Sequence, residues 1–165
     1  MQIRKANECD FDRIMEIYAA ARDFMARNGN PNQWGPTNWP PEQLVRSDIA
    51  SRACHVCEHE GRIVGVFFYD SGRDIEPTYA HIEDGEWADE SPYGVVHRIA
   101  SDGSVKGVGT TCIEWAFRQC GHLRIDTHGD NAVMQHLLEK LGFEHRGTIY
   151  VEEDDYPRLA YEKVS

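Results

Sequence analysis

Apolar residues recur at helical spacing over residues 11–25, and the positions between them are mostly polar. This pattern predicts an amphipathic first helix that buries one face. Asn7, followed three residues later by Asp10, is typical of the residues that cap the start of a helix. A shorter helix is expected over residues 42–49. The segment between the two helices, residues 28–41, is rich in Gly, Pro and Asn and contains two tryptophans, which predicts a loop that folds back on the body or lines a pocket.

Short apolar runs bounded by turn residues make up most of the remaining chain. Residues 53–59 and 62–69 predict two strands joined by a hairpin turn. Residues 70–90 are polar and predict a loop excursion, with a short strand over residues 77–82. Further strands are expected over residues 1–5, 93–101, 122–128, 143–151 and 158–163, with helices over residues 110–120 and 131–141. This order predicts a single α+β domain, in which a mixed central sheet of six to seven strands carries helices on both faces.

The chain of 165 residues is long enough for one domain with a sizeable core. Its sequence contains no apolar run of membrane-spanning length and no signal peptide at the N-terminus, so we expect a cytoplasmic protein that does not bind membranes. The net charge of -11 disfavours nucleic acid as a partner. This negative charge is compatible with an acidic site entrance that attracts a cationic acceptor, such as an amine. It is also compatible with a surface charge that only keeps the protein soluble.

The five cysteines are an odd number in a chain with no export signal, so we expect reduced and mostly buried thiols. Cys54 and Cys57, with His55 and His59 beside them, have the spacing of some zinc and redox sites. The segment is predicted to be a strand, however, and an odd spacing places the two thiols on opposite faces. The sequence offers no second pair of this kind to complete a four-ligand site, so we expect no metal here.

A glycine-containing run, Val-Lys-Gly-Val-Gly-Thr at residues 105–110, lies between a predicted strand and a predicted helix. Two glycines two positions apart let a ligand approach the backbone without meeting a Cβ atom. The helix that follows presents free N–H groups and the positive end of its dipole. The run predicts an anion cradle, typically for a phosphate, although a tight strand-to-helix turn leaves the same pattern. It is neither a P-loop nor a dinucleotide-binding loop, because Cys112 stands where the latter needs its third glycine.

Two blocks of the sequence resemble the GCN5-related N-acetyltransferase (GNAT) family. Residues 104–109 match its acetyl-CoA loop, (Gln/Arg)-x-x-Gly-x-(Gly/Ala), except that Ser104 replaces Gln or Arg. Residues 131–143 match a helix that opens with Asn and ends like (Leu/Phe)-Tyr-Glu-Lys-x-Gly-Phe, except that Leu138 replaces Tyr. The blocks occur in the family's order and at about its spacing, and the clear resemblance covers residues 93–162.

The resemblance implies the acyl-CoA N-acyltransferase fold, acetyl-CoA as the donor and N-acetyltransferase activity. In the family, the fourth and fifth strands splay apart and the pantetheine arm of the cofactor lies between them, while the glycine loop holds the pyrophosphate. Lys106 can pair with a phosphate, and a solvated loop lysine explains it equally well. Asn131 matches the family asparagine that commonly contacts the cofactor, and a helix N-cap also explains it. The residues to which the resemblance assigns cofactor contacts are Ile99, Ala100, Ser101, Ser104, Val105, Lys106, Gly107, Val108, Gly109, Thr110 and Asn131.

Transfer to an amine needs a general base near the opening between the two strands, and three residues are candidates. Asp126 lies on the predicted fifth strand, where relatives that acetylate protein N-termini often have a glutamate that acts as the base. His128 follows on the same face of that strand. Histidine ordinarily titrates near neutral pH, which suits His97 on the fourth strand to the same role. We place Asp126 first, then His128, then His97, and each is also open to a structural role, Asp126 as an ion-pair partner of Arg124 or Arg98.

Leu138 stands where many relatives have the tyrosine that protonates the CoA thiolate. Three alternatives stay open: water supplies the proton, another side chain supplies it, or the thiolate needs no dedicated acid. The tyrosines in the last strands and turn that are candidates for this side chain are Tyr150, Tyr156 and Tyr161. The acceptor site is expected to form from residues 22–39, residues 70–90 and the acidic turn at residues 152–155. Their aromatic and acidic side chains suit a cationic amine.

The favoured function is an acetyl-CoA-dependent N-acetyltransferase that acetylates a primary amine of a small molecule or peptide by direct transfer. Cys112 and Cys120 are predicted on helix faces and not as nucleophiles. Leu138 and Ser104 depart from the family pattern, and these departures motivate an alternative function. In this alternative, the chain is a non-catalytic protein of the same fold that binds CoA as a sensor or serves as an interaction domain. Relatives often dimerise, so a homodimer is compatible with the sequence.

Overall fold

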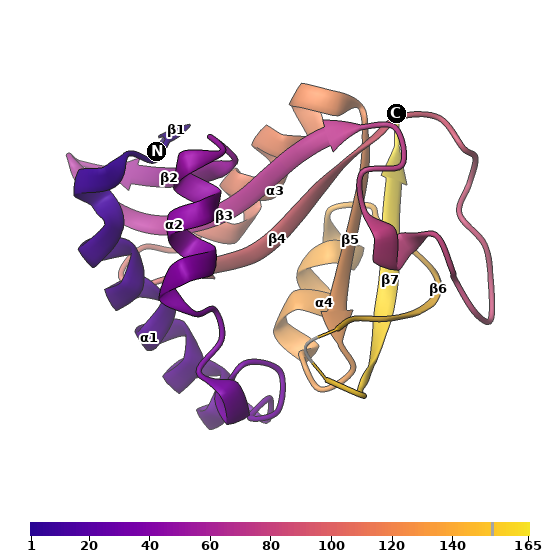
Figure 1. Cartoon of the computed structure of the whole chain (residues 1–165), viewed down its shortest axis with the longest axis horizontal. Helices are drawn as coiled ribbons and strands as arrows, with labels where there is room; N and C mark the ends of the chain where they lie inside the picture. Colours follow the sequence, from indigo (N-terminus) through magenta and orange to yellow (C-terminus); the bar gives the residue numbers. More distant parts are fainter. Residues whose placement is uncertain (153) are drawn as a thin grey trace.

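Seven strands form one mixed sheet in the order β1-β2-β3-β4-β5-β7-β6 in the computed structural model, which describes residues 1–152 and 154–165 (Figure 1). Neighbouring strands pair antiparallel except β4 and β5, which run parallel. The predicted α+β fold class is confirmed. The strands are β1 (Gln2–Lys5), β2 (Cys54–His59), β3 (Arg62–Gly72), β4 (Tyr93–Ser101), β5 (His122–His128), β6 (Glu144–Tyr150) and β7 (Pro157–Val164). The helices are α1 (Phe11–Arg27), α2 (Glu42–Ala50), α3 (Val108–Cys120) and α4 (Ala132–Lys140), with 3-10 turns at Glu8–Asp10, Gly35–Thr37 and Pro77–Tyr79.

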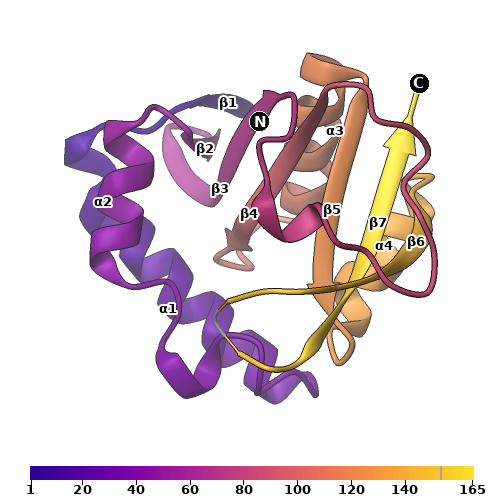
Figure 2. The same cartoon turned by 45° about the vertical axis from the view of Figure 1, so that its right-hand side comes forward.

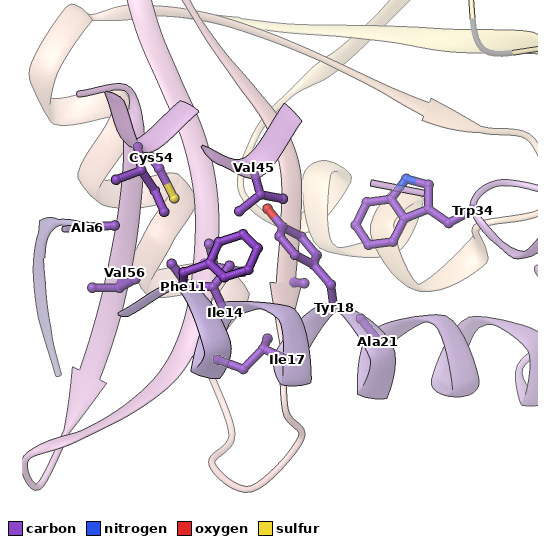
Figure 3. Close-up of a cluster of buried hydrophobic side chains, with 13 residues drawn as sticks. Ala6, Phe11, Ile14, Ile17, Tyr18, Ala21, Trp34, Val45, Cys54 and Val56 are labelled. Atoms are coloured by element: carbon purple, nitrogen blue, oxygen red, sulfur yellow. The ribbon is translucent and has the colours of Figure 1, made fainter. Parts of the chain in front are cut away.

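Helices cover both faces of the sheet, because successive strand residues point to opposite sides. Val56 belongs to a buried cluster that α1 and α2 share with one face (Figure 3), whereas its neighbour Cys57 packs with α3 and α4 on the other. Cys54 lies in the first cluster, so the two thiols face opposite sides as predicted. All five cysteines are free, and in residues 1–152 and 154–165 no group of His, Cys, Asp or Glu is arranged to hold a metal ion. No helix in this described part combines the length and apolar character that a membrane span needs.

The loop between α1 and α2 folds back on the body, as its two tryptophans predict. Trp34 is buried and meets the ring of Tyr18 edge-on at 5.8 Å, as Figure 3 shows for the cluster above α1. Trp39 is half-buried and packs against the same cluster. The loop therefore has a fixed place beside the sheet, and its residues are available to line a site.

Several boundaries differ from the predicted ones. The strand expected over residues 77–82 is wrong, because Pro77 opens a 3-10 turn that carries the side chain of Tyr79 into the core. The segment 73–92 pairs with the sheet through an isolated β-bridge between Glu83 and Thr148. Strand β3 is longer than predicted because its pairing with β4 continues to Gly72. Of the predicted acidic turn, Glu153 lies outside the described residues.

Strands β4 and β5 start side by side and then diverge (Figures 1 and 2). Their parallel pairing joins Gly94 to Leu123 and Val95 to Arg124, near the start of each strand. Beyond these pairs, backbone groups of β4 that face β5 have no strand partner there, so the opening between the strands can accept hydrogen-bonding groups of a ligand. The splay implied by the family resemblance is present.

A bulge at Arg98 bends β4 at the opening. The register against β3 shifts between Val66 and Phe68, and Arg98 has a left-handed backbone with φ of 50°. Its guanidinium makes two hydrogen bonds of 2.9 and 3.0 Å to the Asp48 carboxylate on α2. The Tyr18 hydroxyl on α1 donates to the Arg98 carbonyl at 2.8 Å. A bulge adds a residue to one strand and increases its local twist, and here two helices hold it in place.

A buried carboxylate fixes the far end of the segment that joins β3 and β4. Glu162 on β7 accepts hydrogen bonds from His122 at 2.6 Å, from Arg124 and Arg146 at 3.0 Å each, and from the Ala88 amide at 2.8 Å. Arg124 in turn lies between the rings of two aromatic residues that close this segment, Trp87 at 4.3 Å and Tyr93 at 4.1 Å. Burial acts to raise the pKa of Glu162, but the hydrogen bonds from His122, Ala88 and Arg124 outweigh it and lower the pKa below its ordinary value.

Glu162→Gln is expected to destabilise the protein by about 3 kcal/mol at neutral pH, because it leaves the buried cations without their counter-charge. The depressed pKa means that this stability is fully present above the unfolded-state pKa of about 4.3 and is lost as the pH falls through the folded-state pKa. Urea unfolding at neutral and acidic pH measures both effects, with the exposed Glu114→Gln on α3 as the matched control. Equal unfolding midpoints for the two variants at neutral pH would contradict the role given to Glu162.

Candidate active site

A pocket of about 280 Å³ lies at the opening between β4 and β5. Side chains from widely separated parts of the chain meet there, which explains why no single segment of the sequence reveals it. The described lining residues are Met25, Gln33, Trp34, Trp39, Glu76, Pro77, Thr78, Val96, His97, Arg98, Ile99, Ile125, Asp126, Thr127, Asn131, Met134, Val151, Glu152 and Arg158.

His97 on β4 is held by a carboxylate that the sequence analysis did not single out. Its Nε2 lies 2.7 Å from Oε2 of Glu76, which precedes the 3-10 turn Pro77–Tyr79. The Thr78 hydroxyl donates to the other oxygen of Glu76 at 2.8 Å, and the Glu76 amide donates to the Tyr93 hydroxyl at 3.2 Å. Both the carboxylate and the backbone of Glu76 are therefore fixed. Burial acts to raise the pKa of Glu76, but the hydrogen bonds from His97 and Thr78 lower it below its ordinary value.

Asp126 on β5 faces the same pocket. The Tyr79 hydroxyl donates to its Oδ2 at 2.7 Å, and that same oxygen lies 4.0 Å from Nδ1 of His97. Burial first, and the Asp126 charge second, raise the pKa of Tyr79 well above its ordinary value, so Tyr79 remains a donor. The predicted candidates Asp126 and His97 are thus brought together, and the alternative of an Asp126 ion pair with Arg124 or Arg98 is not what the geometry shows.

His128 lies at the end of β5 and is not among the residues that line the pocket. Its Nδ1 accepts a hydrogen bond from the Asp130 amide at 2.9 Å, and its ring packs on Tyr156 at 5.0 Å. Burial is the main cause that lowers the pKa of His128. A base role for His128 stays a prediction that this placement does not favour.

The glycine run forms the start of α3, as the anion-cradle prediction requires. Gly107 has φ of 83° and is the N-cap residue, and the first helical hydrogen bond is the one from the Thr111 amide to the Gly107 carbonyl at 3.0 Å. The N–H groups of Val108, Gly109 and Thr110 precede that bond and have no acceptor within the helix. A Cβ atom on Gly109 would lie 3.0 Å from Leu137 on α4, so the second glycine also lets α4 approach.

The other predicted cofactor contacts divide between backbone and side chain. The side chain of Val108 is buried in the core, so only its amide faces a ligand. The amide and hydroxyl of Ser104 both donate to Asp102, at 2.9 and 2.6 Å. Lys106 is exposed and Val105 is half-buried. On β4, Ile99 lines the pocket, while Ala100 and Ser101 pair with β3 through Val66 and Gly65 and lead from the pocket to the cradle.

Asn131 caps α4 and also lines the pocket. Its Oδ1 accepts from the Met134 amide at 3.1 Å, which confirms the N-cap interpretation. Its Nδ2 donates to the side-chain oxygen of Gln33 at 3.0 Å, and so ties the loop between α1 and α2 to α4. A contact between Asn131 and a cofactor stays a prediction.

Leu138 does not leave a gap where relatives have their tyrosine. It is fully buried in the core cluster that contains Ile113 of α3. The described residues that line the pocket include no tyrosine. Tyr161 is buried beside His145, at a ring distance of 5.4 Å. No proton donor for the leaving thiolate is therefore assigned.

The comparisons with known proteins agree with this architecture. The model of the acetyltransferase (GNAT) family matches residues 11–143. A GNAT-family acetyltransferase from Streptococcus agalactiae 2603, solved by crystallography, is 30% identical, with a TM-score of 0.89 over 99% of this chain and 95% of that one. The curated proteins include no match to this chain.

Two more distant structures share the fold. One is a GNAT-family acetyltransferase from Listeria monocytogenes 4b F2365, which is 16% identical with a TM-score of 0.71 over 98% of this chain and 93% of that one. The other is a ribosomal-protein-alanine N-acetyltransferase from Brucella melitensis, which is 20% identical with a TM-score of 0.65 over 100% of both chains. The family model spans most of the chain and the Streptococcus agalactiae structure covers nearly all of it, so this chain belongs to the GNAT acetyltransferase family.

Proposed function

We propose that this chain is an acetyl-CoA-dependent N-acetyltransferase that transfers an acetyl group directly to a primary amine. The observation that carries the proposal is the meeting of His97 and Asp126 at the point where β4 and β5 diverge. Family membership supports an acyltransferase, and this pair of proton acceptors supports an amine as the acceptor. The expected cytoplasmic location and homodimer stay predictions.

The chain's own groups fit the donor. The amides at the start of α3 would hold its pyrophosphate, because they lack helical acceptors and sit at the positive end of the helix dipole. The unpaired edge of β4 near Ile99 would accompany the pantetheine arm. The donor supplies an acetyl thioester. In the net reaction the amine nitrogen bonds to the acetyl carbon, the carbon–sulfur bond breaks, and CoA leaves as a thiol together with one proton.

The acceptor amine must lose a proton before it can attack, because an ammonium has no lone pair. His97 and Asp126 lie in one pocket with side chains that are 19% and 11% exposed, so a bound ammonium would meet them away from bulk water. Either group can take the proton. The buried Tyr79 hydroxyl orients Asp126.

The charges of the pocket suit a cationic acceptor. Among the described residues, the carboxylates of Glu76, Asp126 and Glu152 line it. The two arginines of the lining are each engaged by a carboxylate, Arg98 by Asp48 and Arg158 by Asp154 at 2.9 to 3.1 Å. The ring of Trp39 adds a face that can pack on a cation. We propose a primary amine of a small molecule or peptide, positively charged in solution.

Acetyl-CoA is expected to raise the melting temperature. At about 100 times its dissociation constant it adds about 2.7 kcal/mol to the free energy of unfolding, which corresponds to a rise of roughly 5–11 °C for a chain of this size. A thermal unfolding scan with and without acetyl-CoA measures the shift, with free adenine as the control ligand that lacks the pyrophosphate and thioester. No shift with acetyl-CoA would contradict the cofactor assignment.

The alternative, a CoA-binding sensor or interaction domain, is motivated by the buried Leu138 and by Ser104, whose amide and hydroxyl are occupied by Asp102. A sensor predicts the same thermal shift as the enzyme but no release of free thiol with any amine. A plain interaction domain predicts neither.

A further inference from the structure

The two ring nitrogens of His97 have different surroundings. Nε2 lies 2.7 Å from the Glu76 carboxylate, within hydrogen-bond distance. Nδ1 lies 4.0 Å from Oδ2 of Asp126, which is too long for a hydrogen bond. The asymmetry matters because a neutral histidine carries its single proton on one nitrogen and a lone pair on the other.

Glu76 decides which nitrogen carries the proton. An ionised carboxylate can only accept hydrogen bonds, so Nε2 must be the donor in this contact. Glu76 is ionised at neutral pH, since its pKa lies below its ordinary value. Its carboxylate cannot turn away freely, because Thr78 holds the second oxygen at 2.8 Å. The neutral ring of His97 is therefore held with its proton on Nε2 and its lone pair on Nδ1.

The lone pair on Nδ1 and the Asp126 carboxylate can bind one ammonium together. Two acceptor atoms 4.0 Å apart both come within hydrogen-bond reach of a nitrogen placed about 2.9 Å from each. A primary ammonium then has one further N–H group and its carbon in the two remaining tetrahedral directions. A tertiary ammonium has one N–H group and cannot contact both acceptors, whereas a primary ammonium contacts both and keeps a third N–H for another acceptor of the pocket.

The other groups around His97 do not change the position of its proton on Nε2. Arg98 follows it in β4 and directs its guanidinium to Asp48, and its cation lies over the ring of Phe68 at 4.7 Å. Phe68 packs on the His97 ring at 5.6 Å, and Tyr79 meets it at 6.1 Å with its hydroxyl on Asp126. In the part of the chain that the structure describes, the carboxylates within 4.0 Å of the ring are those of Glu76 and Asp126, while the Asp48 carboxylate farther away is paired with Arg98.

The geometry points to Glu76 as a positioning residue, which holds the proton on Nε2 of His97 so that Nδ1 and Asp126 form a two-point receptor for the primary ammonium of the acceptor. This inference rests on the proposed function, because it deepens the recognition of the acceptor at the same pocket. When the ammonium gives its proton to Nδ1, the ring becomes an imidazolium with Glu76 as its counter-charge.

Glu76→Gln is expected to lower kcat/KM about 100-fold, because a glutamine amide can either accept from or donate to Nε2 and so no longer fixes the proton there. The thermal shift with acetyl-CoA should not change. The control is Glu86→Gln, the same change on an exposed residue of the same segment. Equal values of kcat/KM for the two variants would overturn the inference.

A second measurement reads the tautomer in the unsubstituted protein and does not depend on how Glu76→Gln folds. Nitrogen chemical shifts of ¹⁵N-histidine-labelled protein at mildly alkaline pH report the tautomer of His97, whose signals are identified by their loss in His97→Gln. A proton on Nε2 is expected, and a proton on Nδ1 would overturn the role of Glu76. Absence of turnover with any amine would instead reject the proposed function, whatever the tautomer, so the two failures can be told apart.

Discussion

Replacing Gly107 with valine is expected to abolish acetyl-CoA binding at any practical concentration. Gly107 opens α3 with φ of 83°, a conformation that costs a residue with a Cβ atom about 1–2 kcal/mol and a β-branched residue more. A Cβ atom built there meets only the end of Met1, at 3.9 Å, so the valine side chain would point into the open space where the pyrophosphate is expected. A weakening of binding by about 100-fold or more corresponds to at least about 2.8 kcal/mol.

Gly103→Val is the matched control for this prediction. Gly103 lies in the same connection with φ of 77° and has nothing within 4 Å of an added Cβ atom, so the cost in backbone strain is comparable. It precedes the run whose amides are proposed to bind the pyrophosphate. Isothermal titration with CoA should find binding in Gly103→Val and none in Gly107→Val. If both variants bound CoA like the unsubstituted protein, the assignment of the cradle would have to be abandoned.

His97→Gln is expected to lower kcat about 10³-fold and to leave CoA binding unchanged, because it removes the nitrogen that takes the proton of the acceptor. Asp126→Asn should also slow turnover and flatten the pH profile of kcat/KM. The two changes together should cost little more than the larger one alone, since groups that act as a unit are not additive.

The matched control is His81→Gln, on a side chain that is 83% exposed in the same segment as Glu76. Steady-state kinetics with the best acceptor of an amine panel measure all of these effects. Normal turnover of His97→Gln would exclude His97 as the base and would leave Asp126 alone in that role.

The periodic parts of the fold were predictable from the sequence. The apolar stripe of α1 buries Ile14 and Ile17 completely, and the alternation along β2 sends Val56 and Cys57 to opposite faces. Patterns of this kind depend on local geometry, so a single sequence carries them. The turn at Gly107 was predictable for the same reason, because a left-handed backbone before a helix calls for glycine, whereas the binding of an anion there stays a prediction.

The candidate active site was predictable only in part. Asp126 and His97 could be singled out, because they lie on strands whose place in the fold follows from the resemblance. Glu76 could not, because the polar segment that carries it has no periodicity and its contact with His97 depends on tertiary packing. The burial of His128 also depends on tertiary packing, in this case against Tyr156. Only the assembled chain shows which of several polar residues share a pocket.

The most direct test of the central claim is turnover itself. The protein is incubated with acetyl-CoA and a panel of primary amines, including amino acids, polyamines and peptides with free N-termini, and free thiol is measured together with the mass of each amine. The account predicts equal amounts of thiol and of one mono-acetylated amine, with both reduced about 10³-fold in His97→Gln. Thermal stabilisation by acetyl-CoA without an acetylated product on any amine would contradict the account and favour a CoA-binding sensor.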